Sequence, residues 1–267
     1  MTRRAPSRAG RAPLGLAGPA AIALAFLALP VAGLLVKTPW RQLPALLGQN
    51  EALTALRLSI ECATLAAGVS VVLGVPLAWL MARTRVPGRR FIRALIMVPL
   101  VLPPVVAGLA LLLVFGRTGL LGGFLERDLG ITLPFSTPGV VVAESFVAMP
   151  YLVVSVESAL RASDPQLEEA AATCGANRWQ TFRYVTLPTA APGVAAGTVL
   201  AWARALGEFG ATITFAGDFP GTTQTMPLDV YLALQDDPQA AIALSLVLLV
   251  VCVAVLAGLR ERWFTVR

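Results

Sequence analysis

The sequence predicts an all-helical integral membrane protein with about six transmembrane helices. Its mean hydropathy of +0.75 and its 13% content of charged residues lie outside the range of soluble domains. Six apolar runs are close to the roughly 20 helical residues that cross a bilayer. The basic residues gather in alternate loops, which is typical of multi-pass membrane proteins. A soluble protein of 267 residues could not wrap a core around six such helices.

The first apolar run, residues 19–36, follows a tail over residues 1–18 that is rich in Arg, Pro and Ala. This composition predicts that the tail is disordered. The run is longer than the apolar core of a signal peptide, and no small-x-small cleavage pattern follows it. We therefore expect a retained membrane anchor.

The second, third and fourth runs occupy residues 60–82, 94–115 and 139–160, each bounded by charged residues, Gly or Pro. The third run contains three prolines, and because proline lacks an N–H, we expect this helix to bend or break. The three prolines are Pro99, Pro103 and Pro104.

The linker over residues 161–190, called here the 161–190 linker, is polar and predicts two short helices. Residues 163–166, Ser-Asp-Pro-Gln, fit a capping box with Pro in the first turn of the helix. Glu168 and Glu169 then fall in the early turns, where acids suit the helix dipole. Gly175 can adopt the left-handed conformation that ends a helix.

Asn177 is the predicted cap of the second short helix, whose one side carries Trp179 and Phe182. The dipeptide at residues 187–188, Leu-Pro, is expected to end this helix before the fifth span. The aromatic side could rest on the bilayer or on neighbouring helices, or the two helices could dock a cytoplasmic partner. The residues alone leave these interpretations open.

The fifth run, residues 191–216, is apolar except for Arg204 and Glu208. An unpaired Arg at mid-membrane costs about 2.5–3.5 kcal/mol on insertion scales, so we expect these i,i+4 residues to pair. The pair could fix helix packing, or Arg204 could attract an anion in a translocation pathway. Small and hydroxyl side chains continue the run, and they could serve close packing or donate hydrogen bonds to an anion. They include Gly210, Thr212 and Thr214.

The sixth run is residues 240–259, and the loop before it, residues 217–239, has four Asp and no Lys or Arg. Fifteen basic residues flank the spans on one side of the predicted membrane and four on the other. This bias follows the positive-inside rule and places both termini in the cytoplasm. The cytoplasmic C-terminus is expected to be residues 263–267. The net charge of +6 is therefore interpreted as a topology signal and not as a nucleic-acid surface.

Several chemistries are excluded by composition. The chain has no His, so it has no imidazole base and no His-bound metal, and we expect neither a catalytic nor a metal site. Its three Cys are far apart without CxxC spacing. Its single Lys, Lys37, follows Val36, so a GxxxxGK[ST] phosphate loop is impossible. The sequence therefore predicts a chain that is not an enzyme and needs no cofactor. If the chain drives transport, the energy must come from elsewhere, through ATP hydrolysis by a partner.

Residues 169–188 resemble the EAA loop of the membrane subunits of ABC importers. The family pattern is Glu-Ala-Ala, three residues, Gly, nine residues and Ile-x-Leu-Pro; here Val185 replaces the Ile. In that family the loop sits in a groove of the ATP-hydrolysing subunit. The resemblance therefore implies an ATPase-coupling site at Glu168, Glu169, Ala170, Ala171, Gly175, Arg178, Leu187 and Pro188.

Residues 203–231, with 73–85 and 98–116, are similar to molybdate and sulfate permeases within this family. The resemblance covers residues 53–262 and leaves residues 1–52 outside it. It implies a permease domain over residues 19–262 in the inner membrane.

The same resemblance implies a set of partners and a substrate. They are a second permease copy in a homodimer, two copies of a cytoplasmic ATPase and an extracytoplasmic solute-binding protein, with molybdate as the substrate. A contact with the binding protein is expected in the outward loop at Thr222, Thr223, Gln224 and Thr225, where an ordinary turn is the alternative.

Three other functions were weighed. A sulfate, thiosulfate or tungstate importer, possibly heterodimeric, would share these motifs because the anions are chemically close. An ion-coupled secondary transporter would need titratable groups along its path and would lack the EAA loop. A membrane enzyme is disfavoured because no paired catalytic set exists.

Overall fold

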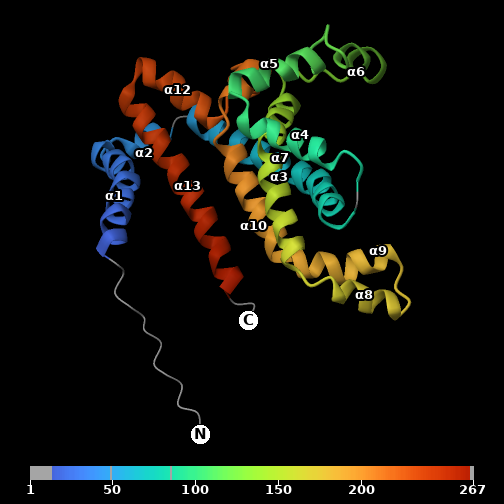
Figure 1. Ribbon diagram of the computed structural model, residues 1–267. Helices are drawn as coiled ribbons and strands as arrows, with labels where there is room; N and C mark the ends of the chain where they lie inside the picture. The colour runs from blue at the N-terminus through green and yellow to red at the C-terminus, as the bar shows by residue number, and fades with distance from the viewer. Residues whose placement is uncertain (1–13, 49, 85, 265–267) are drawn as a thin grey trace.

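The computed structural model describes residues 14–48, 50–84 and 86–264, and all regular structure in these ranges is helical (Figure 1). The predicted all-helical fold class is confirmed. Most of the predicted disordered tail lies outside the described residues, but residues 14–18 already belong to the first helix. At the other end, residues 263 and 264 are helical, and the rest of the predicted C-terminal tail lies outside the described residues.

Five helices are long and apolar enough to cross a membrane, and a bent pair gives a sixth candidate. The five are α1 (Leu14–Lys37), α3 (Asn50–Arg83), α7 (Thr137–Ala162), α10 (Leu187–Leu206) and α13 (Pro238–Phe264). The bent pair is α4 (Arg89–Val101) and α5 (Pro104–Phe115). The shorter elements are α2 (Leu43–Leu47), α6 (Gly122–Leu129), α8 (Gln166–Thr173), α9 (Arg178–Thr181), the π-helical turn η1 (Phe182–Thr186), α11 (Gly210–Ala216) and α12 (Met226–Asp236).

Helices α3, α7 and α10 pack together as the centre of the bundle. Small residues let α10 approach α7 closely, because a Cβ added to Gly193 would lie 2.2 Å from the Cβ of Ala159. The hydroxyl of Ser155 donates a hydrogen bond to the Gly193 carbonyl at 3.0 Å across the same contact. The helices that enter and leave the 161–190 linker, α7 and α10, are therefore joined along their length.

The third predicted span is broken, as its prolines predict. Helices α4 and α5 meet at an angle of 118° at Leu102 and Pro103. Leu102 has an extended backbone and Pro103 and Pro104 lack the N–H groups that would continue the helical ladder.

The prediction of one helix over residues 191–216 is wrong. Helix α10 ends at Leu206, and α11 starts at Gly210 and packs against α5. A Cβ at Gly210 would lie 2.5 Å from the Cβ of Pro104, so the two helices meet through a glycine. The chain changes direction because Gly207 weakens the helix and tertiary packing against α5 holds the new one.

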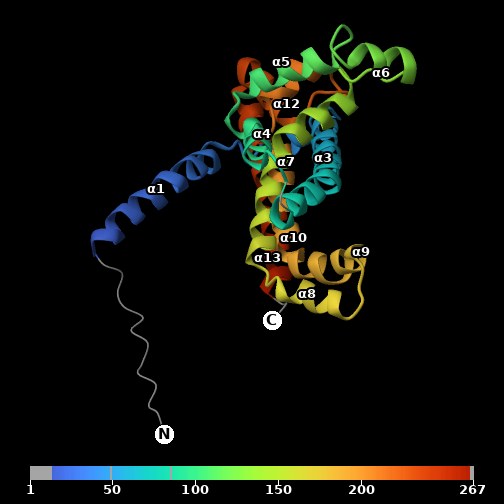
Figure 2. The ribbon, with the colours of Figure 1, turned by 45° about the vertical axis from the view of Figure 1, so that its right-hand side comes forward.

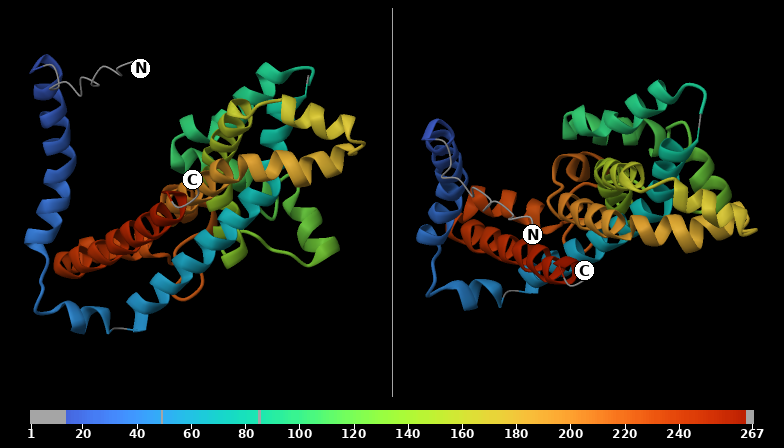
Figure 3. Two further views of the ribbon diagram at one scale, coloured as in Figure 1. Left: turned by 90° about the horizontal axis from the view of Figure 1, so that it is seen from below. Right: turned by 60° about the horizontal axis from the view of Figure 1, so that its bottom comes forward.

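Helix α1 leans away from the rest of the bundle but contacts α13, and the chain passes from it through α2 to α3 (Figures 2 and 3). Helices α8 and α9 project from the end of the bundle where α13 ends (Figure 1). Helices α5 and α6 lie at the opposite end (Figures 1 and 2). The 161–190 linker is thus the part of the described chain that stands out at its end of the bundle.

Candidate functional site

The first helix of the 161–190 linker, α8, follows a turn held by Asp164, and the predicted capping box of Ser163 with Gln166 does not form. The backbone N–H of Gln166 donates to Asp164 Oδ1 at 2.9 Å. The Ser163 hydroxyl instead donates to the Leu160 carbonyl at 2.8 Å, because Ser163 ends α7. A helix was correctly predicted in this part of the linker, but it starts at Gln166 and Ser163 does not cap it.

Gly175 ends α8 in the left-handed conformation that the sequence predicts, with a φ of 89°. The N–H of Ala176 donates to the Ala171 carbonyl at 3.1 Å, and the N–H of Gly175 donates to the Ala172 carbonyl at 3.0 Å. This pair of bonds is a Schellman motif, which satisfies carbonyls at the end of the helix. Ala170, whose carbonyl accepts from Cys174, completes the last turn.

The second helix, α9, begins with the predicted cap. Asn177 Oδ1 accepts from the Gln180 N–H at 2.9 Å, and Gln180 Oε1 accepts from the Asn177 N–H at 2.8 Å. These reciprocal bonds form a capping box. Arg178 is the first residue of the helix and is exposed.

The predicted end of this helix at residues 187–188 is wrong. The chain passes from α9 through the π-helical turn η1 into α10, so residues 178–206 form a continuous helical segment. The Leu187 N–H donates to the Phe182 carbonyl, and Pro188, which has no N–H, follows in the first turn of α10. A wider π turn accommodates a proline inside a helical segment without ending it. A displacement of α9 therefore acts directly on the central helix α10.

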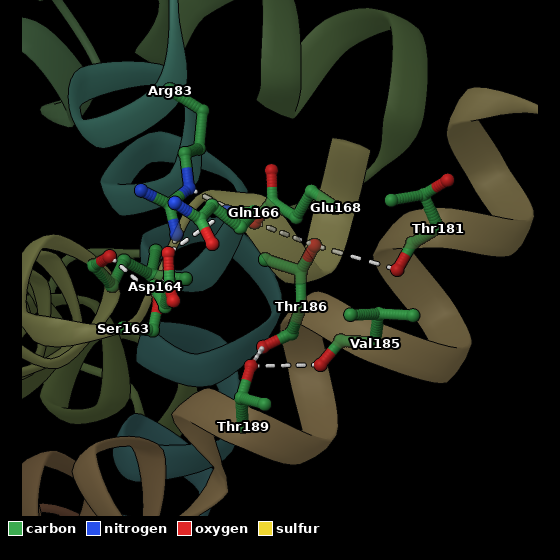
Figure 4. Close-up of polar contacts among 10 residues, drawn as sticks. Arg83, Ser163, Asp164, Gln166, Glu168, Thr181, Val185, Thr186 and Thr189 are labelled. Atoms are coloured by element: carbon green, nitrogen blue, oxygen red, sulfur yellow. Dashed lines mark hydrogen bonds and ion pairs between the residues drawn. The ribbon is translucent and has the colours of Figure 1, made fainter. Parts of the chain in front are cut away.

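A polar network ties α8 to the end of α3 (Figure 4). Arg83 Nε donates to Glu168 Oε1 at 2.9 Å, and the Thr186 hydroxyl donates to the same oxygen at 3.0 Å. Arg83 Nη2 also donates to Ser163 Oγ at 2.6 Å. The network joins α3, the end of α7, α8 and η1 through the Glu168 carboxylate and the Arg83 guanidinium.

The network is partly shielded from solvent. The side chains of Arg83 and Glu168 are 14% and 24% exposed, and Thr186 is buried. Trp79 of α3 packs edge-on against Phe182 at 5.9 Å between ring centroids, beside a cleft of about 490 Å³ whose lining includes Arg83, Glu168 and Thr186. The linker is therefore held by both a charged contact and an aromatic contact with α3.

The outer surface of the linker is available for a partner. Glu169 is exposed, as are the large side chains of Leu167, Trp179 and Tyr184. Trp179 stacks on Phe182 at 5.7 Å, which fixes its ring while one face stays open. An exposed apolar surface beside charged residues is typical of an interaction site.

The predicted pair in the fifth span exists, but at a helix end. Arg204 Nη1 and Glu208 Oε2 are 2.6 Å apart, and Glu208 Oε1 accepts from the Ala211 N–H at 2.8 Å. Glu208 is buried and Arg204 is partly exposed. Glu208 therefore stabilises the break between α10 and α11, while part of the Arg204 guanidinium remains accessible.

Small and hydroxyl residues of the predicted pathway pack α11 against its neighbours. Gly210 and Thr212 are buried, and Thr214 donates to the Gly210 carbonyl at 2.8 Å. A Cβ at Gly108 of α5 would lie 2.6 Å from the Thr214 Cβ. Close helix packing accounts for Gly210 and Thr214 in this structure.

The predicted outward contact, residues 222–225, forms a tied loop. Thr223 Oγ1 accepts from the Phe219 N–H at 2.9 Å, and Thr137 donates to the Thr222 carbonyl at 2.8 Å. Thr223 and Thr225 are buried, so among the four only Thr222 and Gln224 reach the surface. The Thr223 hydroxyl holds the loop, and neither buried threonine presents its hydroxyl to a partner here.

Sequence reasoning did not predict the polar network that Arg83, Ser163 and Thr186 form with Glu168. Arg83 lies 85 positions from Glu168 in the sequence, so no local spacing connects them. The available signal was that Arg83 is the first charge after an apolar run that ends at the same side of the membrane as the linker.

Comparisons with known proteins agree with this architecture. Residues 74–266 match the family described as "Binding-protein-dependent transport system inner membrane component". The molybdenum transport system permease protein ModB of Mycobacterium tuberculosis is 48% identical over 91% of this chain and 92% of its own length. ModB of Escherichia coli K12 is 41% identical, over 78% of this chain and 91% of its own length.

A sulfate permease and a solved structure are also similar. The sulfate transport system permease protein CysW of Escherichia coli K12 is 40% identical over 71% of this chain and 65% of its own length. The crystal structure of a bacterial alginate ABC transporter in complex with its alginate-loaded periplasmic protein contains a chain with a TM-score of 0.71 and 20% identity. The match covers 92% of each chain, and it shows a shared fold.

Proposed function

This chain belongs to the family of binding-protein-dependent transport system inner membrane components, and we propose that it forms the membrane pathway for molybdate in an ABC importer. The observation that carries the choice of substrate is the near-complete alignment with a molybdenum permease. The chain is a multi-pass permease subunit and a transport component. Its proposed role is to move the anion without changing it chemically.

We propose that the 161–190 linker couples the permease to a separate cytoplasmic ATPase, two copies of which serve a homodimer. The exposed side chains of Glu169, Arg178 and Trp179 form the contact surface, and Ala170, Ala171 and Gly175 shape it. Leu187 and Pro188 join this surface to α10 without a break. Motion of the ATPase would therefore be transmitted along α10 and, through Arg83, to α3, as alternating access requires.

The proposed anion pathway lies near the junction of α10 and α11. Arg204 supplies positive potential there, and Glu208 limits it so that a bound oxyanion can leave. Thr212 supports this proposal, because its buried hydroxyl has no hydrogen-bond partner among the described residues. On the opposite side of the membrane, Thr222 and Gln224 are the proposed contacts for an extracytoplasmic binding protein.

Transport of sulfate, thiosulfate or tungstate is the second candidate. It is favoured by one observation: this chain is 41% identical to a molybdenum permease and 40% identical to a sulfate permease of the same bacterium. The experiment is uptake of labelled molybdate, tungstate and sulfate by the reconstituted complex with its own binding protein. We expect ATP-dependent molybdate uptake that excess sulfate does not inhibit; sulfate uptake at an equal rate would overturn the assignment to molybdate.

The coupling role is tested with Glu169→Lys and Gly175→Trp. Both should insert with the transmembrane helices folded but lose ATPase binding and uptake together, because Glu169→Lys alters the exposed surface and Gly175→Trp also strains the turn. Normal ATPase binding and normal uptake in both variants would contradict a docking role for the linker.

The cytoplasmic orientation is tested with the exposed Cys174. A membrane-impermeant maleimide should label Cys174 in inside-out vesicles and not in intact cells, with Cys174→Ser as the control. Labelling from outside would invert the proposed topology.

A further inference from the structure

The first turn of α4 carries an unusual concentration of positive charge. It begins with Arg89 and Arg90, Arg93 follows one turn later, and its first turn contains no acid. Gly88 precedes it and provides no side-chain cap. Because a helix N-terminus carries a partial positive charge, cations there are unfavourable and an anion is stabilised.

Three arginines converge on one buried carboxylate near this helix start. Arg93 and Arg161 donate to Glu157 Oε1, the latter at 2.5 Å, and Arg89 Nη2 lies 3.7 Å from the same oxygen. Arg89, Arg93 and Arg161 are called here the arginine cluster. Their side chains are partly exposed, whereas that of Glu157 is nearly buried. One carboxylate cannot neutralise three guanidinium groups, so two positive charges remain in excess at the cluster.

The cluster is held in place by backbone as well as by Glu157. Arg89 donates to the Met81 carbonyl, and Arg161 Nη2 donates to the same oxygen at 3.4 Å. The guanidinium groups thus connect the end of α3, the start of α4 and the end of α7. A preorganised set of guanidinium donors favours a phosphate group.

An apolar groove continues from the arginine cluster along the same side of α4. The groove has a volume of about 260 Å³, with almost entirely apolar lining. No described residue of α4 is fully buried, and Ile92, Ile96 and Pro99 are only partly buried where they line the groove, so the groove stays partly open. The α4 residues 89, 92, 93, 96 and 99 follow helical spacing, so the charged and apolar parts form one stripe. The groove is lined by Ile92, Ile96 and Pro99 of α4, Leu77 of α3, and Met149 and Val153 of α7.

We infer that the arginine cluster and this groove form a binding site for one anionic phospholipid. The phosphate lies on the arginines, and an acyl chain lies between α4 and α7. A free oxyanion would satisfy the excess charge but would leave the adjoining groove empty, whereas a lipid satisfies both. The site is separate from the proposed anion pathway and from the proposed contact surface at Glu169, Arg178 and Trp179, although Arg161 is also the first residue of the 161–190 linker. The bound lipid stabilises the packing of the bent α4–α5 pair onto α7.

The test compares lipid binding to the purified, delipidated full-length permease by native mass spectrometry and thermal unfolding. The probes are phosphatidylglycerol, phosphatidylcholine with the same acyl chains, and inorganic phosphate. Phosphatidylglycerol should bind and raise the Tm, and phosphatidylcholine and phosphate should do so much less. With both Arg89→Gln and Arg93→Gln, phosphatidylglycerol should bind roughly 30-fold more weakly, since each basic residue near an anionic lipid contributes about fivefold.

Two further variants keep the test decisive. The double variant Arg117→Gln and Arg127→Gln removes the same charge from a distant part of the chain and should bind phosphatidylglycerol like the wild type. Ile96→Trp fills the groove while leaving the arginines intact, and it should also weaken the lipid. Equal stabilisation by inorganic phosphate, equal binding of phosphatidylcholine, or unchanged binding by both the Arg89/Arg93 variant and Ile96→Trp would overturn the inference.

Discussion

Replacing Glu168 with Gln should loosen the contact between the 161–190 linker and α3. The substitution keeps the size of the side chain but removes the charge that Arg83 and Thr186 contact at 2.9 and 3.0 Å. A hydrogen bond to a charged group contributes about 1.5–3 kcal/mol when shielded, and exposed ion pairs contribute about 0.2–1 kcal/mol. Because Arg83 and Glu168 are 14% and 24% exposed, we expect an intermediate interaction energy of about 1–2 kcal/mol.

A double-mutant cycle with Arg83→Gln and Glu168→Gln measures this energy from thermal or denaturant unfolding of the purified permease. The matched control is the Arg57–Glu61 pair on α3, which has an Nε–Oε1 distance of 2.6 Å but side chains that are 81% and 52% exposed. Its cycle should give a clearly smaller interaction energy, because solvent screens an exposed i,i+4 pair. Both cycles measure an Arg–Glu pair. The Arg83–Glu168 pair is more buried and joins residues 85 positions apart, whereas the Arg57–Glu61 pair is exposed and lies within one helical turn.

The same variants report on transport. If the linker must be held against α3 to transmit motion, losing about 1.4 kcal/mol of interaction energy lowers about tenfold the equilibrium constant between the linker packed against α3 and the linker detached from it. Uptake per ATP hydrolysed should then fall in Glu168→Gln and recover partly when the charges are exchanged in Arg83→Glu with Glu168→Arg. An interaction energy no greater than that of the Arg57–Glu61 control, with unchanged uptake per ATP, would refute the reasoning.

Three other predictions follow from particular residues. Gly175→Ala should destabilise the linker by about 1–2 kcal/mol through backbone strain, because the φ of Gly175 is 89° and an added Cβ would meet no neighbour within 4 Å. Limited proteolysis at the linker measures this loss of stability, and an unchanged cleavage rate would contradict the left-handed turn. Gly193→Ala should cost about 1–3 kcal/mol in unfolding free energy by forcing α10 from Ala159, while Gly33→Ala, which meets no neighbour within 4 Å, should be neutral or slightly stabilising. The pKa of Asp229 in α12 is raised by burial and then by Glu51 and Asp218, so its contribution to stability is present below the ordinary Asp pKa and is lost as pH rises through the raised value. Asp229→Asn should therefore reduce the loss of Tm between about pH 4 and pH 7 measured in the same detergent.

The membrane-embedded helical class, the approximate positions of most spans and the broken third span could be predicted from the sequence. Apolar runs of bilayer length and the prolines at 103 and 104 act locally, because each residue's hydropathy or missing N–H has its effect within a few positions. The Gly175 turn and the Asn177 capping box were predictable for the same reason, since their bonds close within five residues.

Tertiary structure decided the features in which distant residues meet. The end of α10 at Leu206 depends on the packing of α11 against α5, and the continuation of the helix through Pro188 depends on a π turn. The partner of Glu168 is 85 positions away, so its identity depends on how α3 and α7 pack. Local sequence determined which segments enter the membrane and where short helices start, because hydropathy and capping are short-range. Only packing decided which charges pair, because an ion pair requires two side chains that the chain brings together after its helices have formed.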